Sequence, residues 1–159
     1  MNNSIEAVCV FNDNGIKGNI ILKEDLVNKL TAIYINLQGV KPGYHGIHIH
    51  RFGDLREGCQ SVCEHYNPYN KNHGGPGDIE RHVGDLGNIL ANKKGIVKSI
   101  IYDKMVKLRG KYSVIGRSIV IHEDIDDLGR GGFKDSKTTG HSGKRIACSI
   151  IGYSKNNII

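Results

Sequence analysis

The segment GIHIH, residues 46–50, places two histidines two positions apart in a short apolar run. Such a run predicts a β-strand, in which side chains at positions i and i+2 point to the same face. His48 and His50 would then stand side by side, with Ile47 and Ile49 turned the other way. The pair is a candidate for metal binding, and taken alone it fits two surface histidines on a half-polar strand equally well.

A second set of possible ligands follows in the long segment after this strand. It comprises His65, His73, His82 and Asp85, and three imidazoles with one carboxylate complete a closed tetrahedral site for Zn²⁺. Residues 52–83 are polar and Gly-rich, and a loop of this length is uncommon in a compact domain unless it is functional or held in place. Metal binding would order it, because the binding energy becomes folding energy.

Three further histidines, His45, His122 and His141, lie outside this loop. His122 ends the apolar run at residues 118–121. Together with His48 and His50 it favours Cu(II), because nitrogen-rich tetragonal sites suit copper. His45 lies three residues before His48, so we assign it to structural hydrogen bonding near a turn, and we expect His141 to be exposed among small residues.

The elements that must position these residues are predicted to be strands. Aliphatic or alternating runs separated by turn residues indicate eight of them, at 4–11, 16–22, 30–37, 46–51, 84–90, 96–102, 115–122 and 145–151. This pattern favours an antiparallel sandwich or Greek-key barrel. A second long polar segment, 123–144, interrupts the pattern as 52–83 does. The 159 residues predict a single domain, with residues 154–159 as a frayed tail.

Composition narrows the classes of partner. The chain has a net charge of +6, which favours anionic partners, but its lysines are scattered and form no basic helix, so we expect no nucleic acid partner. No run approaches the ~20 apolar residues that span a bilayer, so we expect no membrane association. The first residues lack the pattern of a secretory signal. We therefore expect a cytoplasmic protein, or one in the host cytoplasm if the source is a virus.

Four blocks of sequence together resemble one family. They are GYHGIHIHRFGD, HYNPYNKNHGGPGDIERHVGDLGN, IGRSIVIHEDIDDLGRGG and GHSGKRIACSIIG. From about residue 4 to residue 153 the chain resembles the intracellular eukaryotic-type copper/zinc superoxide dismutases. The resemblance implies an all-β fold, an eight-stranded antiparallel Greek-key barrel or sandwich with two long functional loops. It also implies an antioxidant enzyme that converts two superoxide radicals to oxygen and hydrogen peroxide by alternating Cu(II) and Cu(I).

The resemblance also implies roles for individual residues. One copper per subunit would be bound by His48, His50, His65 and His122, and one zinc by His65, His73, His82 and Asp85. His65 would bridge the two metals and act in catalysis with Arg145, which would guide and hold the anion. Asp126 would hydrogen-bond one ligand histidine of each metal, and Cys59 and Cys148 would form a disulfide.

Two expectations about partners complete this interpretation. The family implies a homodimer, formed through the loop of Cys59 and residues 150–152. Members that depend on a dedicated copper chaperone tend to have prolines beside the arginine, whereas Lys144 and Ile146 flank Arg145 here. We therefore expect that a copper chaperone is not required.

Three other functions fit the residues less well. A copper-delivery or copper-buffering protein built on the same domain would lack some ligands or Arg145, and all are present. A mononuclear zinc hydrolase would need an open zinc position. No position would remain open here, because four ligands would fill the site: His65, His73, His82 and Asp85. A nucleic-acid-binding barrel is favoured only by the net charge.

Overall fold

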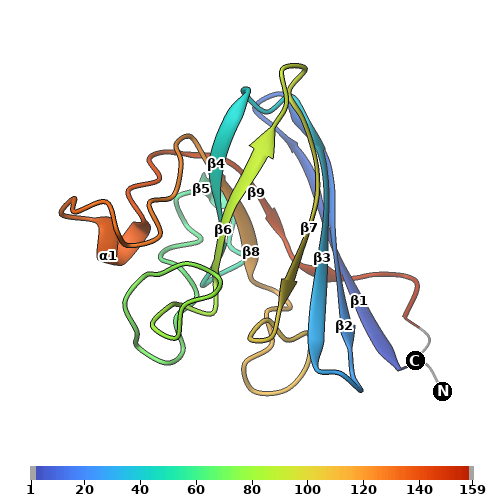
Figure 1. Cartoon of the computed structure of the whole chain (residues 1–159). Helices are drawn as coiled ribbons and strands as arrows, with labels where there is room; N and C mark the ends of the chain where they lie inside the picture. Colours follow the sequence, from blue (N-terminus) through green and yellow to red (C-terminus); the bar gives the residue numbers. More distant parts are fainter. Residues whose placement is uncertain (1–2, 158–159) are drawn as a thin grey trace.

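The computed structural model describes residues 3–157, which fold into two antiparallel sheets packed face to face (Figure 1). The larger sheet has the order β10-β1-β2-β3-β7, formed by Gly152–Tyr153, Ser4–Asp13, Ile16–Asp25, Leu30–Gln38 and Ile96–Asp103. The smaller sheet has the order β6-β4-β8-β9, formed by Asp85–Ala91, Gly43–His50, Ser118–His122 and Arg145–Ile150. The predicted all-β class is confirmed, as two sheets rather than a closed barrel.

All eight predicted strands are present, with ends that differ by a few residues. Three short elements were not predicted: β5 (Arg56–Cys59), β10, and the one-turn helix α1 (Ser136–Thr139) in the second long loop. β5 and β10 are too short to show an alternating pattern. The long loops, one of which carries α1, extend to one side of the smaller sheet (Figure 1).

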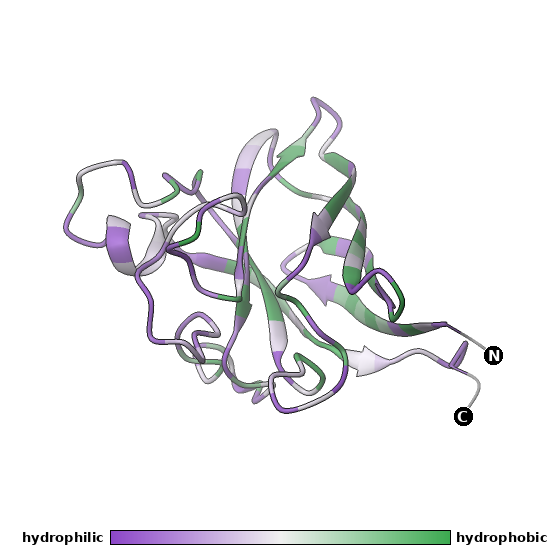
Figure 2. Cartoon of the chain, turned by 60° about the horizontal axis from the view of Figure 1, so that its bottom comes forward, coloured by the Kyte–Doolittle hydropathy of each residue, from purple (hydrophilic) through white to green (hydrophobic). Residues whose placement is uncertain are grey.

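Alternation along the strands builds the core. In β1 the side chains of Ala7, Cys9 and Phe11 are buried on one face, and residues between them are partly or fully exposed. The buried hydrophobic residues are mostly aliphatic and lie between the two sheets. Figure 2 shows the hydrophobic colour concentrated in the strands and the polar colour in many of the connections. The β1–β2 hairpin turns at Asn14 and Gly15, both at positive φ, as a two-residue type I′ turn requires.

Strands β4 and β8 are buried on both faces, β4 from His45 onwards and β8 throughout. Ile47 and Ile49 belong to the core between the sheets. His48 and His50 point to the opposite face, where the long loops cover them, and each is at most 1% exposed. The smaller sheet is therefore a rigid support with polar side chains enclosed on its outer face.

The two chain ends meet at the larger sheet. Asn157 accepts a hydrogen bond from Glu6 N–H and donates one to Glu6 O, at 2.7 Å each. Ser154, Asn156 and Asn157 are thus hydrogen-bonded to Glu6 of β1. Residues 158–159, the remainder of the predicted frayed tail, lie outside the described residues. Within residues 3–157, no helix has the length and apolar character needed to cross a membrane.

Candidate metal centre

The four adjacent strands of the smaller sheet each contribute a residue to one site. Asp85 begins β6 opposite His48 of β4, and His122 ends β8 opposite Arg145 of β9. His50 lies two residues after His48 on the same face. His65, His73 and His82 come from the first long loop and are also buried. The sequence therefore places ligands on neighbouring strands, and the loop brings the others to them.

One group of four histidines has its ligand nitrogens within 4.8 Å of one another: His48, His50, His65 and His122. Carbonyl acceptors determine how two of these rings are protonated. His50 donates from Nδ1 to Cys63 O at 2.7 Å, and His122 donates from Nδ1 to Gly143 O at 3.2 Å. Their Nε2 atoms, 3.4 Å apart, are then unprotonated and face each other, as two ligands of one cation would.

A second group surrounds the carboxylate of Asp85. Its Oδ1 lies 3.0 Å from His65 Nδ1, 2.9 Å from His73 Nδ1 and 3.0 Å from His82 Nδ1. The most compact set of ligand atoms here contains His48 with His65, His73 and Asp85, while His82 approaches through Asp85 and through His65 Nδ1, 3.4 Å away. His48 and His65 are common to both sets of ligand atoms. One nitrogen of His48 is bonded to Asp126, whereas His65 has one ring nitrogen for each group, with Nδ1 on the Asp85 side and Nε2 left for the other histidines.

One buried nitrogen provides a test of whether these groups suit metal ions. His48 Nδ1 is enclosed and has no hydrogen-bond partner among the described residues. A buried polar atom without a partner costs roughly 1–3 kcal/mol, so an arrangement that leaves one beside other imidazoles needs a compensating ligand. Imidazole nitrogens and one carboxylate are donors that zinc and copper accept. The residues therefore fit two metal ions.

The electrostatics keep the histidines of the first group neutral. Burial, and then the neighbouring His65, lowers the pKa of His50 to about 2 and that of His122 to about 3. Burial likewise holds the pKa of His48 well below its usual value. Because a neutral imidazole is the metal-binding form, these rings are ready to coordinate at neutral pH.

The second group contains the negative charge. Although burial opposes its ionisation, hydrogen bonds from His65, His73 and His82 hold the pKa of Asp85 below its usual value. Burial alone would lower the pKa of His73, but hydrogen bonds to Asp126 and Asp85 raise it to about 9. A divalent cation would compensate the enclosed carboxylates in place of a proton on this ring.

Asp126 connects the two groups from behind. Its carboxylate accepts from His48 Nε2 at 2.7 Å and from His73 Nε2 at 2.8 Å, and all three side chains are buried. Second-shell carboxylates of this kind fix the orientation of ligand imidazoles. Gly140, at φ +69°, leaves room for the contact, because a Cβ there would lie 2.1 Å from Asp126 Oδ1. The hydrogen bonds implied by the resemblance are therefore present.

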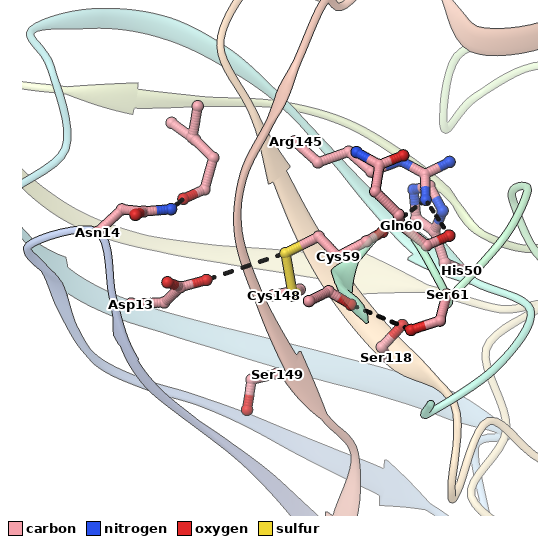
Figure 3. The surroundings of a disulfide bond; sticks show 12 residues. Asp13, Asn14, His50, Cys59, Gln60, Ser61, Ser118, Arg145, Cys148 and Ser149 are labelled. Carbon is pink, nitrogen blue, oxygen red and sulfur yellow. Dashed lines mark hydrogen bonds between the residues drawn. A yellow bond between two sulfur atoms is a disulfide. The ribbon is translucent and has the colours of Figure 1, made fainter. Parts of the chain in front are cut away.

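Arg145 and the disulfide lie beside the first group (Figure 3). Cys59 and Cys148 are bonded, with Cα atoms 5.8 Å apart and a separation of 89 positions in the sequence. Arg145 donates from Nη1 to Cys59 O at 2.7 Å, so the disulfide and the guanidinium hold the same segment against β9. The side chain of Arg145 is half-buried, and burial lowers its pKa, while its charge also opposes protonation of His50 and His122.

Sequence reasoning missed several groups that position the site. The carbonyls of Cys63 and Gly143 have no side-chain signal. Asn88 exchanges two hydrogen bonds with the backbone of Asp126, at 2.9 and 2.7 Å, and His73 N–H donates to Lys137 O of α1 at 2.8 Å. As expected, His45 makes structural contacts, with ring nitrogens 2.8 Å from His122 O and 2.7 Å from Lys41 O. His141 is exposed, also as expected.

An antiparallel β-sandwich with two adjoining buried ligand groups, connected by the ring of His65, belongs to the class of two-metal β-proteins. Residues 16–151 match the family described as copper/zinc superoxide dismutase (SODC). The chain therefore belongs to the copper/zinc superoxide dismutase family, whose members are oxidoreductases that act on superoxide and whose metals are copper and zinc. The sequence resemblance is confirmed.

Individual relatives support this membership over most of the chain. A copper-zinc superoxide dismutase of Paramecium bursaria Chlorella virus 1 is 49% identical over 154 residues, which cover 96% of this chain and 81% of the relative. Superoxide dismutase (Cu-Zn) 3 of Arabidopsis thaliana is 48% identical over 140 residues, covering 88% and 85%. The crystal structure of the clock protein EA4 superposes with a TM-score of 0.91 at 36% identity, covering 97% of this chain and 98% of that one.

Proposed function

We propose that this protein is a superoxide dismutase that converts two superoxide anions and two protons to oxygen and hydrogen peroxide, with one copper and one zinc per chain. The observation that carries this proposal is the enclosed ring of His65, which has one nitrogen towards each ligand group, whereas His48 has one nitrogen bonded to Asp126. A histidine shared in this way couples a redox metal to a second metal that holds the ring in place. Relatives bearing the name of this enzyme support the reaction.

For copper, we propose His48, His50, His65 and His122 as ligands. Three of these rings use one nitrogen in a hydrogen bond, to Asp126, Cys63 O and Gly143 O. The nitrogens left for the metal are then His48 Nδ1, His50 Nε2 and His122 Nε2, together with His65 Nε2. Four nitrogen donors suit copper.

For zinc, we propose His65, His73, His82 and Asp85. The Nδ1 atoms of the three histidines all lie within 3.0 Å of Asp85 Oδ1, a spacing that a central ion would open towards ordinary metal–ligand geometry. The donors fill four positions, so this ion would be structural. Its role would be to keep His65 oriented and the first long loop ordered.

In the reaction, copper supplies the electron transfer when it is bound, by alternating between Cu(II) and Cu(I). Arg145 attracts the superoxide anion and holds it beside His122, its neighbour across the β8–β9 pair. When it is not coordinated, His65 Nε2 would take a proton from solvent and give it to the departing peroxide, which would take its second proton from water, while His65 Nδ1 stays on the Asp85 side. Asp126 keeps the rings of His48 and His73 in their orientation throughout.

The test compares metal-loaded variants in a direct assay of superoxide decay. We expect His48→Ala, His122→Ala and copper chelation each to abolish dismutation, while His141→Gln, a change at an exposed histidine outside both groups, leaves it intact. Metal analysis with copper EPR should give one copper and one zinc per chain. Full activity in copper-free protein would refute the assignment.

We also propose a homodimer that uses the surface near the disulfide loop and the end of β9. Phe52 and Ile150 are each 43% exposed, and Gly53 lies close to the backbone of Gly116 and the side chain of Ile150. Exposed apolar side chains grouped in this way are typical of interfaces. Sedimentation velocity should show a dimer that Phe52→Glu with Ile150→Glu converts to monomer; a wild-type monomer would contradict the proposal.

Three remaining predictions concern domain organisation, location and copper loading. One principal core supports a single domain over residues 1–159. The exposed free thiol of Cys63 is compatible with a reducing compartment such as the cytoplasm. We propose that copper loading needs no dedicated chaperone, since Lys144 and Ile146 flank Arg145. Activity after expression in chaperone-deficient cells would support this, and inactive protein rescued by the chaperone would contradict it.

A further inference from the structure

A basic pocket lies beside the metal centre and has His65 in its lining. It has a volume of about 610 Å³ and is lined by residues from two distant segments, 64–70 and 111–117, with Arg51. Arg51, Lys111 and Arg117 bring three positive charges to it, and Glu64 brings one negative charge. The pocket therefore carries an excess of two positive charges, which suits a divalent or more highly charged anion.

Several donors that line this pocket are not used within the protein. Arg117 donates from Nε to Ser113 O at 3.1 Å and from Nη1 to Arg51 O at 2.6 Å, which leaves Nη2 without a partner among residues 3–157. Lys111 Nζ has no hydrogen bond or ion pair in the same part of the chain, and it lies 5.3 Å from the ring centre of Tyr112. Two cationic donors are thus free to bind a ligand.

The positions of these groups are held by aromatic side chains. The guanidinium of Arg117 lies 3.7 Å over the ring of Tyr66, a buried residue next to His65. Tyr112 packs against Tyr69 with ring centres 5.1 Å apart. A planar guanidinium fixed in this way binds phosphate oxygens well, because its orientation is set before the ligand arrives.

We infer that this pocket binds the phosphate group of a small ligand, between Arg117 and Lys111. The charge of a phosphate monoester, about −1.5 to −2 at pH 7, matches the excess of two, and pyrophosphate is a more highly charged anion. The volume lies within the roughly 300–1,000 Å³ typical of small-molecule sites. Arg51 is held at present by Glu64, 2.8 Å away at an exposed position, and can turn to the ligand. The two sources of this chemistry are inorganic polyphosphate and a nucleotide, whose base would pack on Tyr112.

The experiment is isothermal titration calorimetry of the metal-loaded protein with pyrophosphate and with AMP, and with adenosine as the uncharged control. We expect saturable binding of at least one of the two anions, weakened by salt, and no binding of adenosine. Tighter binding of AMP identifies a nucleotide site, and equal or tighter binding of pyrophosphate identifies an inorganic one. Absence of binding by both anions would overturn the inference.

Substitutions inside and outside the pocket test where the anion binds. Lys111→Gln should weaken it about tenfold, the loss expected for one hydrogen bond to a charged group, whereas Lys94→Gln in the β6–β7 turn should not change it. Glu64→Gln should strengthen it, because it removes the repelling carboxylate and releases Arg51, an effect that general disruption would not produce. Arg145→Gln should bind as wild type does. Unchanged binding in Lys111→Gln, or loss of binding in Arg145→Gln, would show that the anion binds elsewhere.

Discussion

Replacing Asp126 by asparagine should separate the two metal sites. The carboxylate accepts hydrogen bonds from His48 Nε2 at 2.7 Å and His73 Nε2 at 2.8 Å, in a fully enclosed position. An amide accepts with only one of its two atoms, so one ring would face an N–H donor, and neither ring would face a negative charge. Each hydrogen bond to a charged group contributes about 1.5–3 kcal/mol, which is about 10–100-fold in metal affinity.

The loss should fall mainly on zinc. His73 lies in a long loop, and its ring is held in place by the carboxylates of Asp126 and Asp85. His48 lies in the middle of the smaller sheet, and its ring also stacks on His65 with centres 3.9 Å apart. A ring held by a rigid strand keeps its orientation better than a ring held by a loop when the shared carboxylate is removed.

The assay is the copper and zinc content of the Asp126→Asn protein after equilibration with graded concentrations of a competing chelator. We expect zinc to leave at chelator concentrations about 10–100-fold lower than for wild type, with a smaller change for copper. The matched control is Asp124→Asn, which removes an exposed carboxylate from the same loop and should change neither. Unaltered retention of both metals, or loss of copper with full retention of zinc, would refute the reasoning.

Three further changes test other parts of the structure. Arg145→Gln should lower the second-order rate constant for superoxide about tenfold with both metals retained, measured by pulse radiolysis at low salt; an unchanged constant would remove its guiding role. Asp103→Asn leaves Arg81, 2.7 Å away and 2% exposed, as an unpaired buried charge, so urea unfolding should show a loss of about 3–5 kcal/mol. The pKa of His122 is lowered to about 3 in the folded chain, so below pH 6.5 the unfolded chain binds more protons. The metal-free protein should therefore lose about 2 kcal/mol of stability at this residue between pH 7.5 and pH 5, a loss that His122→Asn should reduce; an identical pH profile in that variant would contradict the pKa argument.

Local patterns predicted the strands because each pattern reports the environment of a single strand. The alternation that buries Ala7, Cys9 and Phe11 is visible in the sequence, and so is the i, i+2 spacing of His48 and His50. The two residues of β10 are too few to show any period, and α1 has one turn inside a polar loop. Whether the sheets close into a barrel depends on how the two sheets meet, so it cannot be predicted from the pattern of any single strand.

The candidate site was predicted unevenly for a similar reason. Side chains with metal-binding chemistry can be recognised from their types and spacing, but the partners that orient them are set by the fold. The acceptor for His50 is a carbonyl at residue 63, and the acceptor for His122 is a carbonyl at residue 143. Arg117 and Tyr66, which line the basic pocket, lie about fifty residues apart in the sequence and meet only in the folded chain. Neither contact has a local signature in the sequence.

The order of strands in the smaller sheet explains how two metals and an anion-binding arginine can share one surface. Across β6-β4-β8-β9 lie, in turn, Asp85, the pair of His48 and His50, His122 and Arg145. These strands are far apart in sequence, and their registers determine the distances between the groups. The proposed copper site takes three of its four ligands from this rigid sheet, whereas the proposed zinc site takes three of its four from the loop. Formation of the sheet therefore prepares the redox site and the arginine, and zinc then orders the loop that carries His65 into place.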